Sequence, residues 1–485
     1  MRIDSVFRTA AVLLIGTVQA FAAADDLPAQ ARAAMDRGVA FFHQQVAAHG
    51  GYVYLYSADL KKQEGEGKTT RETVWVQPPG TPSVGEAFVR AYVRTGDAAC
   101  LAAAKDAAEC LLQGQYRSGG WNASVEFDPA VRAKEAYRTD RPAPKKRQRN
   151  NSSLDDDKTQ SALRFLMQLD RALKFKDERI HEATLFALDS LLAAQYPNGG
   201  WAQVWEAPAD PQTPANLKAR YPEDLPRKYP GGDYWNFYTF NDNNISNVID
   251  VLQLAEEIYG GGRYRAAMLK AGEFILAAQM PDPQPAWAQQ YNFQMEPVWA
   301  RKFEPAAVSG GESQRLIETL MELYIDTGDR RFLEPIPKAL AYLKKSQLPD
   351  GRLARFYELR TNRPLYLTTD YTLTYTDDDL PTHYGFQVPS RLPQLERRYE
   401  TVSTMTPAKL AQEPKKSTAL PKSASLEPRV RKIIAEQDDR GAWVEAGRLK
   451  YHGKGDSTDR VIASETFAKN LDLLSQFLQV SAAVR

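Results

Sequence analysis

Hydrophobic positions recur at helical spacing in four successive segments of similar design. Each segment contains an apolar-faced helix, a short polar or glycine-rich break, a second helix and a turn with a glutamine, and three of these turns end in tryptophan. The segments are residues 82–121, 157–201, 244–287 and 310–354, and partial units of the same kind occur at 31–54 and 427–446. The pattern predicts helical hairpins that repeat along the chain.

Repeated helical hairpins either close into an α/α toroid or stack as a solenoid. Long loops follow three of the hairpins, at residues 122–154, 202–241 and 289–309, and they are rich in proline, tyrosine, tryptophan and charge. Loops that a rigid scaffold presents are where function is usually found. We therefore predict an all-α fold, an α/α toroid of helical hairpins with long functional loops and a few short strands.

The N-terminus has the pattern of a secretory signal. Arg2 and Arg8 supply positive charge, an apolar stretch follows, and small residues then precede a run of acidic positions. We predict that residues 1–24 are a signal peptide, cleaved after Ala22 or Ala24, and that the mature protein is secreted or periplasmic. No other apolar run is long enough to span a bilayer, so we expect no membrane segment in the mature form.

The mature chain is expected to divide into three parts. Residues 25–404 form the catalytic toroid, and residues 429–485 add C-terminal helices that complete it. Residues 405–428 between them are rich in proline, lysine, alanine and serine, which predicts a flexible excursion. The net charge of +1 does not indicate nucleic acid as a partner. We expect a monomer.

Two predicted helices begin with runs of acidic or amide residues. "SSLDDDKTQSALRFL" places three aspartates, Asp155 to Asp157, ahead of an apolar helix, and "TFNDNNISNVIDVL" places Asn241, Asp242 and Asn243 in the same position. One such residue is enough to cap a helix. Several carboxylates gathered at one point repel each other unless a cation or a cationic side chain meets them. Because the two runs start adjacent repeats, we expect both to face one cleft.

A segment rich in arginine and aromatic residues follows the fourth repeat. Apolar and polar residues alternate here, which predicts extended structure. Arginine on such a segment suits the recognition of carboxylates by its planar fork, although solvated surface arginine is the alternative. The arginines are Arg352, Arg355, Arg360 and Arg363.

Four motifs in order give the chain a resemblance to a known family. "SLDDDKTQSALRFL", "YTFNDNNISNVIDVL", "WAQQY" and "ARFYELRTNRPLY" resemble polysaccharide lyase family 10, pectate lyases with an incomplete α/α toroid. The similarity runs from about residue 78 to residue 385. It implies an incomplete α/α barrel and an enzyme that cleaves polygalacturonate, an acidic polysaccharide, by calcium-dependent β-elimination.

The resemblance also implies roles for particular residues. Calcium and arginine would neutralise the uronate carboxylate and stabilise the enolate-like transition state, and aspartates would hold the calcium. The implied catalytic residues are Arg355 and Arg363; the implied substrate-binding residues are Asp155, Asn241, Arg301, Asn362 and Tyr357; and the implied ligands of Ca²⁺ are Asp242 and Asp155.

The chain departs from the family pattern at two cationic positions. Thr369 stands where the family's expected catalytic arginine would be, and Ala306 replaces another arginine. Either Arg363 or Arg301 takes over, or the protein acts on a related substrate, or it is a catalytically impaired relative that binds oligogalacturonides without cleaving them. An alternative from another class is a triterpene-cyclase-like toroid enzyme, because residues 115–121 and 195–201 both read Q-x-x-x-G-G-W and "LDDD" resembles an acidic initiation motif.

Overall fold

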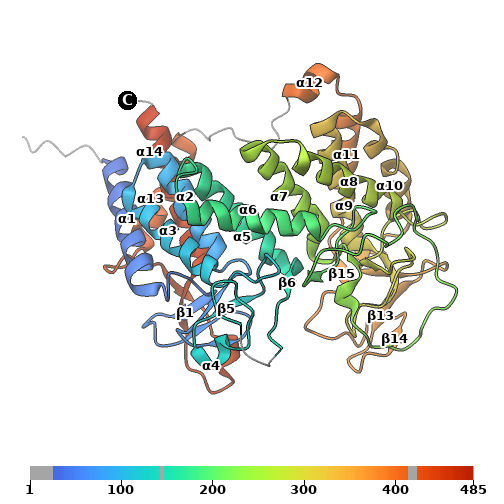
Figure 1. Cartoon of the computed structure of the whole chain (residues 1–485), viewed down its shortest axis with the longest axis horizontal. Coiled ribbons are helices and arrows are strands. Elements are labelled where there is room, and N and C mark those ends of the chain that lie inside the picture. Colours follow the sequence, from blue (N-terminus) through green and yellow to red (C-terminus); the bar gives the residue numbers. More distant parts are fainter. Residues whose placement is uncertain (1–25, 143–146, 413–422, 484–485) are drawn as a thin grey trace, which may run out of the picture.

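The computed structural model describes residues 26–142, 147–412 and 423–483, and the predicted signal peptide lies outside the described residues. The described chain is an arc of helical hairpins, with loops and short strands gathered at one end of the helices (Figure 1). Each repeat that the hydrophobic pattern predicts contains two helices. The predominantly helical fold with short strands is therefore confirmed.

The elements have these bounds. The helices are α1 Leu27–Phe41, α2 Thr81–Thr95, α3 Ala98–Gln113, α4 Pro129–Arg132, α5 Lys158–Ala172, α6 Glu178–Ala193, α7 Asn244–Tyr259, α8 Arg263–Ala277, α9 Gly310–Thr327, α10 Ile336–Lys345, α11 Leu392–Ser403, α12 Pro407–Gln412, α13 Ser423–Glu436 and α14 Ser464–Ala483. The strands are β1 Leu55–Ser57, β2 Gln63–Glu64, β3 Lys68–Thr69, β4 Thr73–Trp75, β5 Ser124–Glu126, β6 Ser152–Ser153, β7 Val204–Trp205, β8 Tyr238–Thr239, β9 Gln290–Tyr291, β10 Ala307–Ser309, β11 Leu353–Ala354, β12 Phe356–Glu358, β13 Pro364–Leu367, β14 Leu373–Thr374, β15 Gln387–Val388, β16 Val444–Ala446 and β17 Arg460–Ala463.

The helices form two rows. In one row α14 packs against α2, α2 against α5, α5 against α7, and α7 against α9. In the second row α13 packs against α1, α1 against α3, and α3 against α6. The C-terminal hairpin, α13 and α14, therefore lies beside the N-terminal helices (Figure 1). No helix of the described residues combines the length and apolar content needed to cross a membrane.

The segment expected to be a flexible excursion contains helix at both ends. Helix α12 and the first turns of α13 fall within residues 405–428, while residues 413–422 lie outside the described residues.

The turns with glutamine and tryptophan join one hairpin to the next. In the second full hairpin, Trp201 donates from Nε1 to the carbonyl of Leu191 at 2.9 Å, within its own hairpin. Gln195 donates from Nε2 to the carbonyl of Gly199 at 3.0 Å and to that of Ala267, in α8, at 2.9 Å. The first glycine of the turn, Gly199, has φ of 96°, a conformation that other residues rarely adopt. These residues satisfy buried backbone groups, so their role in the fold is structural.

A turn of the same kind joins the C-terminal hairpin to helix α1. Gln437, after α13, donates to the carbonyl of Gly441 at 3.1 Å and to that of Ala34, in α1, at 2.9 Å. Trp443 donates to the carbonyl of Ile433 at 2.8 Å. The last hairpin therefore contacts the first helix as each repeat contacts the next.

Replacing Trp201 with alanine should destabilise the protein by about 3–5 kcal/mol, because a fully buried aromatic side chain and its hydrogen bond are lost together. Val93→Ala, at a side chain that is 66% exposed on α2, should change stability by less than about 0.5 kcal/mol. Denaturant unfolding of both variants measures the difference. Equal midpoints would show that the tryptophan turn contributes nothing to the hairpin.

Short strands lead directly into the inner helices. Strand β6 pairs with β7 and is followed by α5, strand β8 pairs with β9 and is followed by α7, and strand β10 pairs with β12 and is followed by α9. The N-termini of these helices therefore lie at the same end of the arc, with the loops.

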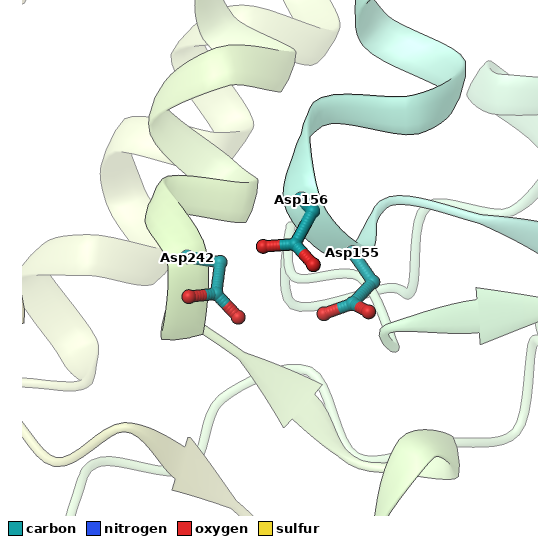
Figure 2. Close-up of side chains that lie close together, drawn as sticks. All are labelled: Asp155, Asp156 and Asp242. Atoms are coloured by element: carbon teal, nitrogen blue, oxygen red, sulfur yellow. The ribbon is translucent and has the colours of Figure 1, made fainter. Parts of the chain in front are cut away.

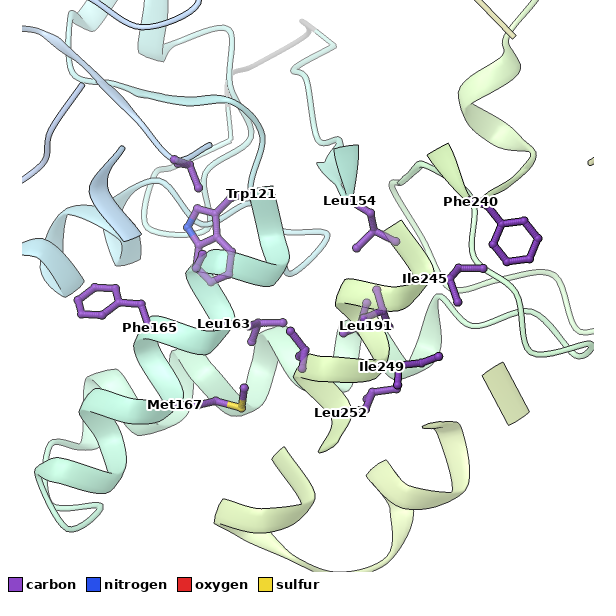
Figure 3. Packing of buried hydrophobic residues seen from close by; sticks show 14 of the residues in the cluster. Trp121, Leu154, Leu163, Phe165, Met167, Leu191, Phe240, Ile245, Ile249 and Leu252 are labelled. Atoms are coloured by element: carbon purple, nitrogen blue, oxygen red, sulfur yellow. The ribbon is translucent and has the colours of Figure 1, made fainter. Parts of the chain in front are cut away.

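Buried side chains fix the positions of the two polar helix starts. Leu154 precedes the aspartate run and is fully buried, and Phe240 precedes Asn241 and is 2% exposed. Both belong to the main hydrophobic core, together with Ile245 and Ile249 of α7 and Leu163 of α5 (Figure 3). Leu154 and Phe240 thus anchor the two polar turns in the hydrophobic core, and the polar side chains that follow them lie outside this core.

Candidate active site

Helices α5 and α7 begin with the same unusual turn. Asp156 and Asp157 have φ of 46° and 64°, and Asp242 and Asn243 have φ of 50° and 60°. Aspartate and asparagine tolerate this left-handed conformation better than most residues do. Neither Asp157 nor Asn243 caps its helix through the side chain. The left-handed backbone therefore accounts for two polar residues in each run, which helix capping does not explain.

The two turns bring three carboxylates together. Asp155 and Asp156, ahead of α5, face Asp242, ahead of α7 (Figure 2). One oxygen from each carboxylate can be chosen so that all three lie within 4.8 Å of one another, and all three residues are partly exposed. The repeat predicts this proximity, because it places equivalent helix starts in neighbouring hairpins. Asp156 was not among the predicted site residues, although it belongs to the aspartate run.

Amide and ammonium groups contact two of the three carboxylates. Asp155 accepts from Lys158 Nζ at 2.8 Å and from Gln203 Nε2 at 2.5 Å. Asp156 accepts from Gln77 Nε2 at 3.2 Å. Asp242 Oδ2 is buried and has no hydrogen-bond partner among the described residues. Asp242 is therefore the carboxylate whose charge the described protein compensates least.

The electrostatic state of the three carboxylates differs accordingly. Burial and then the charge of Asp156 raise the pKa of Asp242 to about 8, against the opposing effect of Arg301. Burial and then Asp155 also raise the pKa of Asp156. Burial opposes ionisation of Asp155 too, but Lys158 overcomes it and the pKa of Asp155 is lowered. The cluster holds excess negative charge that a bound cation would offset.

The pKa of Asp242 predicts a pH-dependent stability in metal-free buffer. Because the folded-state pKa is raised from 3.8 to about 8, this group contributes stability below about pH 4 that is lost as pH rises through about 8. Asp242→Asn removes the ionisation, so the variant should gain thermal stability over the wild type progressively from pH 5 to pH 8, as measured by unfolding in EDTA. A difference that does not vary with pH would contradict the prediction.

Arg301 lies beside the cluster and is held by a buried glutamate. Its Nε and Nη2 donate to the two carboxylate oxygens of Glu304 at 2.7 and 2.6 Å, and Nη2 is 3.6 Å from Asp242 Oδ2. Glu304, 1% exposed, also accepts from Asn241 Nδ2 at 3.4 Å. Gln289 donates to Asn241 Oδ1 at 3.1 Å. Asn241 is buried, and its side-chain amide links Gln289 to Glu304.

Arg355 is joined to this group through an aromatic residue. Its guanidinium lies 4.7 Å from the ring centroid of Tyr384, whose hydroxyl donates to Glu304 at 2.8 Å. Nε donates to the carbonyl of Gly385 at 2.5 Å, and Nη1 is 3.6 Å from Glu312. Of the three guanidinium nitrogens of Arg355, only Nε makes a hydrogen bond to a described residue. Its remaining donors are available for a carboxylate ligand.

Tyr384 and Glu304 were absent from the sequence prediction. Tyr384 lies between two cationic side chains, 4.7 Å from Arg355 and 5.9 Å from Arg301 by ring centroid. Nothing in the local pattern of either residue signals this role, since each is one polar or aromatic residue in an irregular loop.

Three other predicted residues lie elsewhere. Tyr357 is fully buried, and its hydroxyl donates to the carbonyl of Ser346 at 2.6 Å. Asn362 accepts from Tyr342 at 2.5 Å in the tight turn between β12 and β13. Arg363 is exposed and stacks 3.4 Å from the ring centroid of Tyr375. The structure brings together Asp155, Asp242, Asn241, Arg301 and Arg355, but not these three.

The two positions that depart from the family pattern carry no charge. Thr369 is exposed, and its hydroxyl donates to Asp379 at 2.9 Å. Ala306 immediately precedes β10. The cations at the site are Arg301, Arg355 and Lys158.

Fold and site together define a protein of helical hairpins with a carboxylate cluster that suits a divalent cation, flanked by arginines that suit an anionic ligand. Residues 127–351 match the family model described as pectic acid lyase. The resemblance to pectate lyases is thereby confirmed, and the matched segment supports a polysaccharide lyase. It contains both acidic turns and Arg301, and it ends shortly before Arg355.

Comparison with solved structures gives distant similarities. A mutant of a family 10 polysaccharide lyase from Cellvibrio cellulosa, in complex with trigalacturonic acid, is 18% identical over 66% of this chain and 98% of its own, with a TM-score of 0.45. The cellobiose 2-epimerase from Bacillus thermoamylovorans is 11% identical over 93% of this chain and 98% of its own, with a TM-score of 0.42. A search of curated proteins gave no match.

Proposed function

We propose that this protein is a secreted, calcium-dependent pectate lyase, built on an incomplete α/α toroid, that cleaves polygalacturonate by β-elimination. The observation that carries the proposal is the convergence of Asp155, Asp156 and Asp242 beside Arg301 and Arg355, in and next to the segment that matches pectic acid lyases.

The residues fit a calcium ion. Carboxylate oxygens are the ligands that Ca²⁺ prefers, and three carboxylates offer up to six. Asp242 Oδ2 has no hydrogen-bond partner among the described residues, and burial, followed by the negative charge of Asp156, raises the pKa of Asp242. Asp155, Asp156 and Asp242 would hold the ion. When bound, it would neutralise the uronate carboxylate and polarise it towards the enolate-like state.

Arg355 and Arg301 have different roles at the site. Arg355 uses its available donors to bind and orient the carboxylate of the sugar that loses its C5 proton. Arg301, fixed on Glu304, keeps a positive charge beside Asp242. Neutralising that carboxylate makes the C5 proton acidic enough to pass to solvent water. The electron pair that it leaves forms the C4–C5 double bond, the glycosidic C4–O bond breaks, and the departing oxygen takes a proton from solvent.

The direct test is the ultraviolet absorbance of the unsaturated product on polygalacturonate. We expect the absorbance to rise with added calcium and to stop rising when EDTA is added in excess. Formation of product at the same rate in EDTA would refute the calcium dependence, and no product under either condition would refute the lyase.

One observation favours a second candidate, a relative that binds without cleaving. Thr369, in place of the expected basic residue, is hydrogen-bonded to Asp379 in an exposed loop. This candidate predicts calcium-dependent binding of oligogalacturonides by calorimetry with no unsaturated product. The glutamine and tryptophan turns behind the triterpene-cyclase alternative have a structural role, because Gln195 and Trp201 donate to backbone carbonyls of their own hairpin and of the next one.

Secretion has its own test. Expression of the full chain in a bacterium with a signal peptidase should give an exported mature protein whose N-terminus follows Ala22, Ala23 or Ala24. Retention in the cytoplasm with Met1 still present would contradict the predicted signal peptide.

A further inference from the structure

A cavity of about 470 Å³ lies beside the β6–β7 ladder, outside the acidic cluster. Trp235, one of its lining residues, is 37% exposed, which is unusual for a side chain of this size. Asn151 and Asn236 also line the cavity. Within the described part of the chain, the side-chain amides of these two asparagines make no hydrogen bond. An exposed aromatic face with convergent free amides is the composition of a site for a small polar ligand.

The charges around the cavity favour an uncharged ligand. Arg147 lines it, but the guanidinium is 3.7 Å from the carboxylate of Glu206, which lines it too. Asp233 adds a further carboxylate. One cation among two carboxylates leaves an excess of negative charge, so a free uronate would meet repulsion here.

Two segments connect this cavity to the acidic cluster. Ser152 in β6 pairs with Trp205, a cavity residue, and Asp155 follows Ser152 by three residues, a reach of at most about 10 Å. On the second segment, Tyr234 experiences the charges of Arg301 and Asp155, while the next residue, Trp235, lines the cavity. A polysaccharide bound at the cluster can therefore extend to the cavity.

We propose that this cavity is a subsite for an uncharged sugar of the polysaccharide, stacked on Trp235 and hydrogen-bonded by Asn151 and Asn236. The proposal rests on the proposed function, which supplies the polymer. The uncharged sugar has two possible sources: a neutral branch residue or a methyl-esterified uronate of the backbone. The site would let the enzyme accept polygalacturonan that carries an uncharged sugar at this position.

The test is calorimetric binding in EDTA, where no turnover is needed and failure of the lyase activity does not affect the result. The probes are β-1,4-linked galactotetraose, fully methyl-esterified tetragalacturonate and unesterified tetragalacturonate. We expect at least one uncharged probe to bind about tenfold more tightly than the unesterified probe. Binding of the galactan probe alone identifies a branch sugar, and binding of the ester alone identifies the backbone.

Two variants tie the binding to the cavity. Trp235→Ala should weaken binding of the uncharged probe about tenfold or more, while Trp235→Phe, which keeps an aromatic face, should restore most of the affinity. Asp233→Asn should strengthen binding of the unesterified probe. Unchanged affinity in Trp235→Ala, unesterified tetragalacturonate as the preferred probe, or no binding by any probe would each overturn the proposal. Thermal unfolding of each variant checks that the fold is retained.

Discussion

Replacing Arg355 with alanine should lower kcat on polygalacturonate by about 10²–10³-fold, the usual loss when one preorganised donor to a developing negative charge is removed. Burial opposes its charge, but Glu312 and Tyr384 dominate and hold the pKa of Arg355 above its ordinary value. The guanidinium therefore stays protonated, acting as a cation and not as a base. Its unused donors are what the variant removes.

The matched control is Arg363→Ala, which removes the same group from the same hairpin. Arg363 stacks on Tyr375 and follows the turn between β12 and β13, whereas Arg355 precedes β12. We expect Arg363→Ala to keep kcat within about threefold, since exposed groups outside a site contribute little. Equal losses in both variants would place Arg363 in the site, and full activity in Arg355→Ala would remove Arg355 from it.

Strand register explains why the sequence did not separate these two arginines. Alternation of apolar and polar residues correctly indicated extended structure around Arg355 and Arg363. It did not show that Tyr357 pairs with Pro364, a register that puts Arg363 opposite Glu358. The same alternation could not show that Tyr357 faces the core, because both faces of this small sheet are covered.

The helical scaffold could be predicted from the sequence because the patterns that indicate it are local. Helix period and the glutamine–tryptophan turns repeat in each hairpin, and equivalent helix starts in neighbouring hairpins must lie close together. The partners of the site are not local: Glu304 and Tyr384 meet Arg301 and Arg355 only once two irregular loops are folded. Their contacts depend on loop conformation, for which the sequence carries no periodic signal.

The polar runs themselves were only partly understood from sequence. Charge repulsion predicted that a cation or a cationic side chain meets the aspartates, and Lys158 and Arg301 lie beside them. A calcium ion there stays a prediction. The left-handed backbone at Asp156 and Asp242, which aspartate and asparagine tolerate better than most residues do, was not anticipated. The same residues therefore have to fit the left-handed backbone and to supply the carboxylates for the proposed cation.

Asp242→Asn separates those two demands, because asparagine tolerates the left-handed backbone but removes the negative charge. The calcium concentration for half-maximal activity should rise by at least about a hundredfold, since even residues that only orient metal ligands cost 10–100-fold. The control is Asp157→Asn: Asp157 is in the same acidic run, but its carboxylate accepts hydrogen bonds from Arg164 in a salt bridge. That variant should lose stability and keep its calcium requirement.

Measuring the stability of Asp242→Asn distinguishes a loss of calcium binding from misfolding. The variant relieves an ionisation that the metal-free fold opposes, so at pH 8 in EDTA it should be more stable than the wild type although it is far less active. A loss of activity through misfolding would instead lower stability at every pH. Calcium should raise the unfolding temperature of the wild type and of Asp157→Asn, through binding to the folded state, but not that of Asp242→Asn. An equal calcium effect in all three proteins would show that the ion binds elsewhere.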